Sequence, residues 1–568
     1  MFSQLFNVIA FSSGSDAKAE ASVRCYEKLP ASHYVWDTDN SRNLHTVVVT
    51  SYHMLSNVFG PSVYRTWKRS VDPNVELNPK ETTDYDPNWP SNPSGRFRGI
   101  ICDEPQYGLR NPSGFHTTIR WLDAPQVWLF SGSPAPRGLT DMCSYLALFE
   151  HKDLGVKAQV ADAAIGYDPE VNNPYELPDD HPVAPYRFTT FCFRKWIIDN
   201  PNLSPYEQGV AAQKVLKHFF LRREYGSACP INSDRTIARN LPRLQHFRLD
   251  VCFGPSPQAA YDRFYKDWNR RLMLAGVDGQ HDSMPNPRAT RAVTLLTTLP
   301  FLGYLNLYNE FYQDPKDQDG YYQPRDPNAK RTKENDMDFY SWFNVHSELY
   351  EGMPESGEDF QRTRWLLGTM VDYGCSELPT IPYTKTKSVT SATIRRLLLS
   401  SSPKFAAILA LLLRTCIVRD QKVIVWFEYG VTLSIFEELL ESYEFFASDR
   451  ILKLVSSTKD RETVRDTFND HTSTTRVLLA QFGVGGIGLN LQEDCSTAIM
   501  AEPAENLDIE YQVIARIYRL GQQCAVTIYS LTVAGTADAQ TIKYVLYLGL
   551  LRITSAKPPY IPLLDSYG

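Results

Sequence analysis

The sequence predicts an α/β fold built on parallel sheets, and two observations favour it. First, residues 46–50, 99–102 and 127–130 contain consecutive apolar residues instead of an alternation with polar ones. Continuous apolarity is typical of strands that are buried on both faces, as in a parallel sheet. Second, apolar strands alternate with amphipathic helical segments from residue 401 onward, which predicts a three-layer, doubly wound sheet.

The strands and helices of the C-terminal region can be placed one by one. Short continuous apolar runs indicate strands, whereas apolar residues three and four positions apart indicate helices. The pattern places one unit at 401–550 and leaves a tail at 551–568. Within that unit, helices are expected over residues 404–413, 433–442, 461–468 and 506–520, and strands over 422–427, 476–481 and 497–501.

The first 400 residues divide differently. Strand-like segments are concentrated in residues 1–160, whereas 161–400 contains helical patterns, such as 206–223 and 286–309, broken by polar, proline-rich stretches. Proline and clustered polar residues end helices and mark loops. We therefore expect an incomplete α/β unit at 1–160 and a helical, insertion-rich region at 161–400.

Composition excludes several classes of protein. The ten cysteines contain no Cys-x-x-Cys pair and the histidines are scattered, which predicts no structural metal and suits buried thiols in a reducing compartment. The longest apolar run, residues 405–413, is far shorter than the ~20 residues that span a bilayer, so no membrane association is expected. The net charge of −7 means that any contact with nucleic acid must be made by a local basic groove.

A glycine-rich loop follows the strand expected at 476–481. Gly483, Gly485 and Gly488 formally satisfy G-x-G-x-x-G, but a dinucleotide site also needs a long helix before the next strand. The strand at 497–501 follows too closely for such a helix. The glycines therefore provide either a plain turn or a tight loop whose backbone N–H groups approach phosphates.

A second chemical signal lies in the helix expected at 506–520. Gln512, Arg516 and Arg519 have the spacing i, i+4 and i+7, which places them on one helical face. The face could be a solvated one that pairs with nearby carboxylates. Arginine forks are also the groups that stabilise charge on a transferring γ-phosphoryl group.

The two signals together resemble a known family. Gly-Gly-Ile-Gly-Leu-Asn-Leu at 485–491, followed by Gln-x-x-x-Arg-x-x-Arg-x-Gly-Gln at 512–522, is similar to motifs V and VI of the Swi/Snf-type ATPases of helicase superfamily two. The resemblance extends through residues 402–404, 422–427 and 528–536, and so covers most of one RecA-like lobe.

The resemblance implies roles for these residues. Arg516 and Arg519 would be arginine fingers that reach ATP bound between two lobes, and Gln512 would order that interface. The glycine loop would couple the nucleotide site to DNA. Its members are Gly485, Gly486 and Gly488, and Asn490 beside them would contact the DNA backbone.

The first lobe shows a weaker resemblance. Asp103 and Glu104 end an apolar strand and resemble motif II, in which Asp103 would hold Mg²⁺ through water and Glu104 would orient or activate the attacking water. The segment Ser131, Gly132 and Ser133 resembles motif III, which links hydrolysis to lobe movement.

Strand-end residues Thr50 and Ser51 resemble a DNA-contacting segment that precedes motif II. The expected fold is thus two RecA-like three-layer lobes, the first incomplete, joined by a helical, insertion-rich middle region.

The sequence also departs from the family pattern. A motor of this kind needs G-x-x-x-x-G-K-[ST] to cradle phosphates, yet none of the 30 glycines is followed by lysine. The chain as written is therefore expected to be N-terminally incomplete, without its P-loop. Pro105 and Gln106 follow motif II where the family has a small residue and histidine.

Two functions are consistent with these features. By resemblance the chain is an ATP-dependent DNA translocase of the nucleus, acting in chromatin remodelling or DNA repair, with ATP and Mg²⁺ as cofactors. Its partners would be double-stranded DNA or nucleosomes and chromatin-associated proteins. The alternative is a catalytically inactive DNA- or protein-binding module. Because the P-loop lysine is missing, we expect no DNA-stimulated ATPase activity from these 568 residues.

Overall fold

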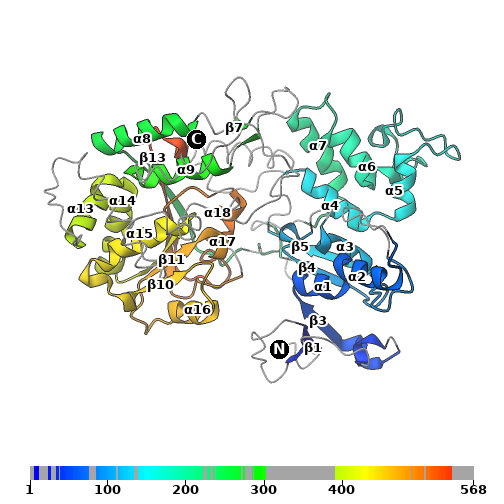
Figure 1. Ribbon diagram of the computed structural model, residues 1–568, viewed down its shortest axis with the longest axis horizontal. Helices are drawn as coiled ribbons and strands as arrows, with labels where there is room; N and C mark the ends of the chain where they lie inside the picture. The colour runs from blue at the N-terminus through cyan, green and yellow to red at the C-terminus, as the bar shows by residue number, and fades with distance from the viewer. Residues whose placement is uncertain are drawn as a thin grey trace. The chain divides into compact units, whose positions relative to one another are not determined.

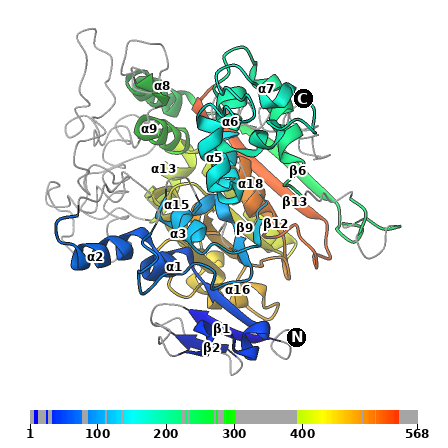
Figure 2. The same ribbon diagram turned by 90° about the vertical axis from the view of Figure 1, so that its right-hand side faces the viewer.

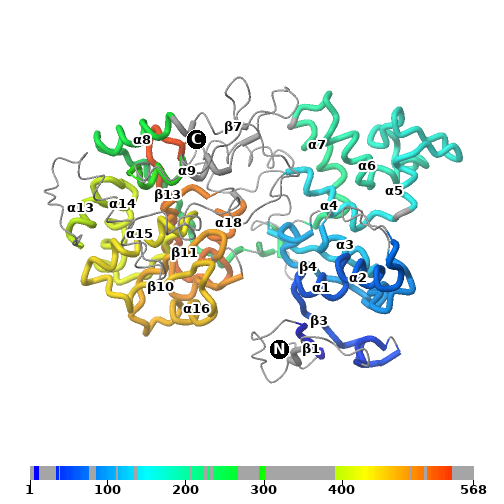
Figure 3. Tube along the Cα trace, in the orientation of Figure 1, coloured from blue at the N-terminus to red at the C-terminus, as the bar shows by residue number. Residues whose placement is uncertain are grey.

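A computed structural model of the chain shows two compact units, one ending at Arg222 and the other running from Arg223 to Gly549 (Figure 1, Figure 3). Ser133, Gly486 and residues 551–568, for which predictions were made, lie outside the described residues. The structure describes 6–301 and 391–539, with gaps at 12–22, 27–32, 38, 76–84, 110–112, 133–137, 222–226, 230–233, 237, 270–272, 275–283, 286, 486–487 and 505–506.

The C-terminal unit is built on a six-stranded parallel sheet, which is typical of a RecA-like lobe. The strands lie in the order β10-β11-β9-β12-β13-β6, and Figure 2 shows β6 running alongside β13. Their bounds are β6 Leu244–Val251, β9 Lys422–Phe427, β10 Ile451–Leu454, β11 Val477–Gln481, β12 Cys495–Met500 and β13 Val526–Val533.

Helices cover both faces of this sheet. All six residues of β9 are buried, because alternate side chains point to opposite faces and each face carries its own core. One core receives side chains from α13 (Ser391–Ser401), α14 (Pro403–Leu412) and α15 (Gly430–Glu441), and the other from α16 (Arg461–Asn469) and α18 (Leu507–Ile514). The predicted three-layer arrangement of this unit is confirmed.

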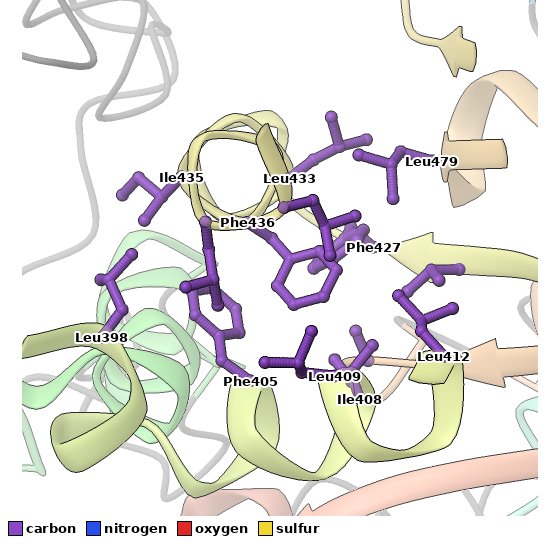
Figure 4. Close-up of a cluster of buried hydrophobic side chains, with 14 of the residues drawn as sticks. Leu398, Phe405, Ile408, Leu409, Leu412, Phe427, Leu433, Ile435, Phe436 and Leu479 are labelled. Atoms are coloured by element: carbon purple, nitrogen blue, oxygen red, sulfur yellow. The ribbon is translucent and has the colours of Figure 1, made fainter. Parts of the chain in front are cut away.

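The first of these cores is dense and aromatic. Phe436 of α15 lies between Phe405 of α14 and Phe427 of β9, with ring centroids 5.0 and 5.7 Å away respectively (Figure 4). None of these three rings is exposed. Aromatic pairs at such distances add about 0.5–1.5 kcal/mol beyond the burial of their area, so this cluster fixes both helices on the sheet.

The sequence-based boundaries of the domains differ from those of the two units. We expected 161–400 to be a separate helical region, but β6 lies within it and pairs along its full length with β13. The unit therefore begins soon after residue 222. The described helices α8 (Pro255–Asn269) and α9 (Pro287–Thr298), and the short strands β7 (Met273–Leu274) and β8 (Met284–Pro285), follow β6.

The N-terminal unit contains two small parallel sheets in its described residues. One has the order β2-β1-β3 and the other pairs β4 with β5. The parallel pairing was predicted, but burial on both faces was not confirmed. The strands are β1 Asn7–Phe11, β2 Val23–Tyr26, β3 Thr46–Thr50, β4 Ile100–Asp103 and β5 Val127–Phe130.

One face of the β4–β5 sheet is packed and the other is open. Ile100 and Cys102 face the core made with α1 (Tyr52–Phe59) and α3 (Gly114–Trp121), whereas Ile101 is 72% exposed and Trp128 57% exposed. The helices of this unit are α1 Tyr52–Phe59, α2 Pro61–Val71, α3 Gly114–Trp121, α4 Thr140–Phe149, α5 Lys152–Gln159, α6 Thr190–Phe193 and α7 Pro205–Leu216.

Among the described residues, no single helix is long and apolar enough to cross a membrane. The segments Ser391–Ser401 and Pro403–Val418 reach that length and apolarity only as a pair, which is bent by 109°.

Candidate functional site

Asp103 and Glu104 lie at the carboxyl end of β4, where the chain turns sharply. The Glu104 amide donates to the Phe130 carbonyl across the sheet at 2.8 Å, and Glu104 has a left-handed conformation with φ 46°. This conformation is uncommon for a residue with a side chain. The turn leaves the Asp103 carboxylate exposed and the Glu104 side chain half-buried.

Gln106 joins the predicted motif II to the predicted motif III. Its side-chain amide donates to the Glu104 carboxylate, and the Ser131 hydroxyl donates to Gln106 Oε1 at 2.7 Å. The Ser131 hydroxyl is also 3.4 Å from Glu104 Oε2. Because Gln106 is only 5% exposed, it holds both groups in a restricted geometry. Sequence reasoning noted Gln106 only as a departure from the family pattern.

Thr50 and Ser51 lie at the start of α1. Ser51 is the N-cap of that helix and its hydroxyl accepts from the Met54 amide at 3.2 Å. The neighbouring Tyr52 hydroxyl donates to the Asp103 carbonyl at 2.9 Å. Burial raises the pKa of Tyr52 well above its ordinary value, so the phenol remains a donor. The DNA contact expected of Thr50 and Ser51 stays a prediction.

The glycine-rich loop of the C-terminal unit contains only one turn of helix in its described part. This turn, α17, spans Phe482–Gly485. Gly488 then has φ +67°, which favours glycine. The described residues between β11 and β12 thus contain no long crossover helix, as the dinucleotide alternative would require. Asn490 is exposed and its carbonyl accepts from the Asn469 side chain at 2.8 Å.

The helix expected over 506–520 is shorter than predicted, because α18 ends at Ile514. The Arg516 amide bonds to the Val513 carbonyl at 3.1 Å, a bond to the third preceding residue rather than the fourth. The Arg516 carbonyl accepts instead from the Leu491 amide of the glycine loop, also at 3.1 Å. The expectation that Gln512, Arg516 and Arg519 share a helical face was therefore wrong.

The loop and the arginine segment are nevertheless brought together. The Arg519 guanidinium donates to the Asn490 side-chain oxygen. Leu491 binds the Arg516 carbonyl, as described above, and Gly521 turns the chain with φ +102°. The structure therefore places the predicted motif V and motif VI residues Asn490, Arg516 and Arg519 in one local arrangement.

A buried glutamine, Gln522, hydrogen-bonds to both parts of this arrangement. Gln522 is 5% exposed, and its side-chain nitrogen lies 3.2, 2.9 and 3.1 Å from the carbonyls of Gln492, Cys495 and Ile517. Its side-chain oxygen accepts from the Cys524 amide at 2.9 Å. Gln522 belongs to the predicted motif VI, but the sequence alone indicates no role for it.

The residues present fit a hydrated magnesium ion better than they fit a nucleotide. An exposed carboxylate at a strand end, such as that of Asp103, is the oxygen ligand that Mg²⁺ prefers, often through water. The Gly-Lys of a P-loop does not occur in the sequence. Among the described residues, no group of three His, Cys, Asp or Glu side chains is placed to hold a metal ion without other ligands.

Part of the chain is similar to known proteins. Residues 403–521 match the family model for the Helicase conserved C-terminal domain. The SNF2 domain-containing protein ENL1 of Oryza sativa is 28% identical over 148 residues, which is 26% of this chain and 14% of the relative. Chromatin remodeling factor mit1 of Schizosaccharomyces pombe is 31% identical over 148 residues, 26% of this chain and 10% of the relative.

Further relatives match over a slightly shorter stretch. The DNA repair and recombination protein RAD54-like of Drosophila grimshawi is 30% identical over 126 residues, which is 22% of this chain and 15% of the relative. In these three matches the chain spans only 10–15% of the relative's own length. Among solved structures, the C-terminal part of the Fun30 ATPase domain is similar. The match covers 56% of this chain and 97% of the Fun30 chain, at 15% identity and a TM-score of 0.34.

Proposed function

We propose that this chain, which belongs to the SNF2 family of helicase-like ATPases through its helicase C-terminal domain, provides the second motor lobe of a nuclear, ATP-dependent DNA translocase. The relatives' names include chromatin remodelling and DNA repair. Duplex DNA, or DNA in nucleosomes, is therefore the proposed substrate.

A single observation carries this proposal. The Arg519 guanidinium contacts the Asn490 side chain, and the Leu491 amide bonds to the Arg516 carbonyl at 3.1 Å. A residue proposed to contact DNA is thus bonded directly to a residue proposed to contact nucleotide. Because these bonds join two separate loops, a shift of one loop would be passed to the other, as coupling of hydrolysis to movement on DNA requires.

The residues of the N-terminal unit would serve the same reaction. ATP with its magnesium ion would supply the phosphoryl group and the positive charge that neutralises it. Asp103 would hold the ion through water, and Glu104 would orient the attacking water. Ser131 is bonded to Glu104 through Gln106, so a change in the position of Glu104 would be transmitted to Ser131. Arg516 and Arg519 would stabilise the charge that develops on the phosphate.

An inactive DNA- or protein-binding module is the second candidate. It is favoured by one specific observation, namely that no glycine of the sequence is followed by lysine. Without the backbone cradle and the lysine of a P-loop, phosphate binding loses its main donors. We accordingly expect these 568 residues alone to bind DNA without hydrolysing ATP.

Two measurements on the full chain test these proposals. Fluorescence anisotropy with a labelled duplex measures DNA binding, and phosphate release with and without duplex measures ATP turnover. Binding that weakens in Asn490→Ala supports the DNA contact, whereas unchanged binding rules it out. Robust DNA-stimulated turnover that is abolished by Arg519→Ala would overturn the expectation of inactivity.

A further inference from the structure

We infer that Gln522 is a positioning residue that sets the placement of Arg516 and Arg519 relative to the glycine loop. The inference deepens the proposed function and rests on it for the role of the arginines. The geometry behind it is local: the Gln522 side chain contacts the end of the loop at Gln492, the first residue of β12 at Cys495 and the arginine segment at Ile517.

The hydrogen-bonding capacity of Gln522 is matched to its surroundings. Its amide nitrogen has two N–H groups, which serve three carbonyl oxygens within 3.2 Å, while its oxygen accepts from the Cys524 amide. The three carbonyls need a donor, and the backbone N–H of Cys524 needs an acceptor. Only one of the two flipped orientations of the Gln522 side-chain amide therefore satisfies all four groups. A buried group of this kind is costly to leave unpaired.

Of the three segments that meet at Gln522, one is the start of β12 and the other two have no regular secondary structure to hold them. The helix α18 has already ended at Ile514, and the residues from Leu491 to Gln492 belong to a loop. The bond from the Leu491 amide to the Arg516 carbonyl lies on this same junction. Without Gln522, the Leu491–Arg516 backbone bond and the exposed Arg519–Asn490 contact would still join the loop to the arginine segment, beside the apolar packing of Leu491 and Ile517 in one core.

The test uses the full chain and hydrogen exchange of individual backbone amides. Gln522→Met keeps the length of the side chain and removes both its donors and its acceptor. We expect the Leu491 amide to exchange at least about tenfold faster in this variant. Gln523→Met is the matched control, because Gln523 is the exposed neighbour and its side chain donates to the Gly521 carbonyl of its own turn; it should leave the Leu491 rate within about twofold.

A second variant separates hydrogen bonding from packing. In Gln522→Glu the side chain can donate one hydrogen bond when protonated, and when ionised it opposes three carbonyl oxygens. Protection of the Leu491 amide, corrected for the intrinsic pH dependence of exchange, should therefore fall as pH rises in this variant alone. A residue that merely filled space would show no such dependence on pH.

Defined outcomes overturn the inference. It fails if Gln522→Met leaves Leu491 protected, or if the amides of β9 and β13 lose protection to the same extent, since Gln522 would then stabilise the whole unit. Repeating the exchange measurement with duplex DNA tests the proposed function separately. If DNA alters amide exchange in neither the unchanged chain nor the variants, the proposed function fails. The positioning role of Gln522 would still be decided by the Leu491 result.

Discussion

A fully buried lysine, Lys404, is expected to contribute strongly to the stability of the C-terminal unit. Lys404 Nζ lies 2.6 Å from Asp538 Oδ2, and neither side chain is exposed. The Thr297 and Thr298 hydroxyls lie 3.2 and 3.4 Å from the same nitrogen. Thr298 in turn donates to the buried carboxylate of Glu502 at 3.2 Å, so one cation serves two carboxylates.

Removal of the lysine charge should be costly. Lys404→Met leaves Asp538 and Glu502 buried without their cation, and breaking a buried ion pair in this way costs about 3–5 kcal/mol. Burial already raises the pKa of Glu502, and the Lys404 charge opposes that rise. A carboxyl with a raised pKa in the folded state binds its proton more tightly there, so the penalty of Lys404→Met should shrink as pH falls.

Hydrogen exchange of the β9 amides measures the free energy of unfolding of this unit separately from the rest of the chain. Asp538→Asn keeps an acceptor for the Val533 amide, which is 3.0 Å from Asp538 Oδ2. The double variant Lys404→Met, Asp538→Asn should therefore recover at least about 2 kcal/mol relative to the sum of the single changes. A cost below about 1 kcal/mol for Lys404→Met, or strict additivity of the two changes, would refute this reasoning.

Three further predictions concern single residues. Burial raises the pKa of Glu510 from 4.5 to about 7, so stability should fall as pH rises between these values, and Glu510→Gln should raise the melting temperature at pH 8 but not at pH 4; equal effects at both pH values would contradict this. Burial lowers the pKa of His246 from 6.5 to about 4, so protection of β6 should be lost as pH falls through this range, and His246→Gln should reduce the loss; an unchanged acid profile would argue against it. Ser402 caps α14 by accepting from the Phe405 amide at 3.3 Å, so Ser402→Ala should cost about 1 kcal/mol in a urea titration, whereas Ser402→Gly should cost a few tenths; a larger effect of glycine would exclude the cap as the cause.

Much of the C-terminal unit could be predicted because its signals are local. The strands at 422–427 and 476–481 and the helix at 404–413 were predicted within a few residues of their observed bounds. Each combines an apolar run of the right length with a clear end, such as Ser402 and Pro403 before α14. Local chemistry of this kind depends little on the rest of the fold.

The elements that were missed depend on distant partners. The strand β6 is polar and partly exposed at Gln245, His246 and Arg248, so its sequence resembles a loop as much as a strand. It forms a strand because β13 offers a free edge far along the chain. The early end of α18 likewise had no local signal: the Arg516 amide bonds to the Val513 carbonyl, and the Arg516 carbonyl accepts from the distant Leu491 amide.

The candidate site was predicted in its residues more than in its geometry. The resemblance to family motifs identified Glu104, Ser131, Arg516 and Arg519 as candidates. It could not show that Gln106 joins Glu104 to Ser131, or that Gln522 joins the glycine loop to the arginine segment. Both glutamines are buried, and side-chain bonds between segments that are distant in sequence leave no periodic signal. The one local sign in the sequence is that Gln522 directly follows a motif glycine, Gly521, which has φ +102° in the structure.

During synthesis of this protein, β6 must wait for β13 before the two strands can pair. His246 of β6 and Ser530 of β13, whose side chains are 2.6 Å apart, are separated by 284 positions. At a translation rate of ~5–20 residues per second, β6 leaves the ribosome roughly 15–60 s before its partner strand exists. During that interval an edge-forming segment with an exposed phenylalanine, Phe247, has no partner. Chaperone dependence of folding should therefore be concentrated in this early segment rather than in the helicase-like region that follows it.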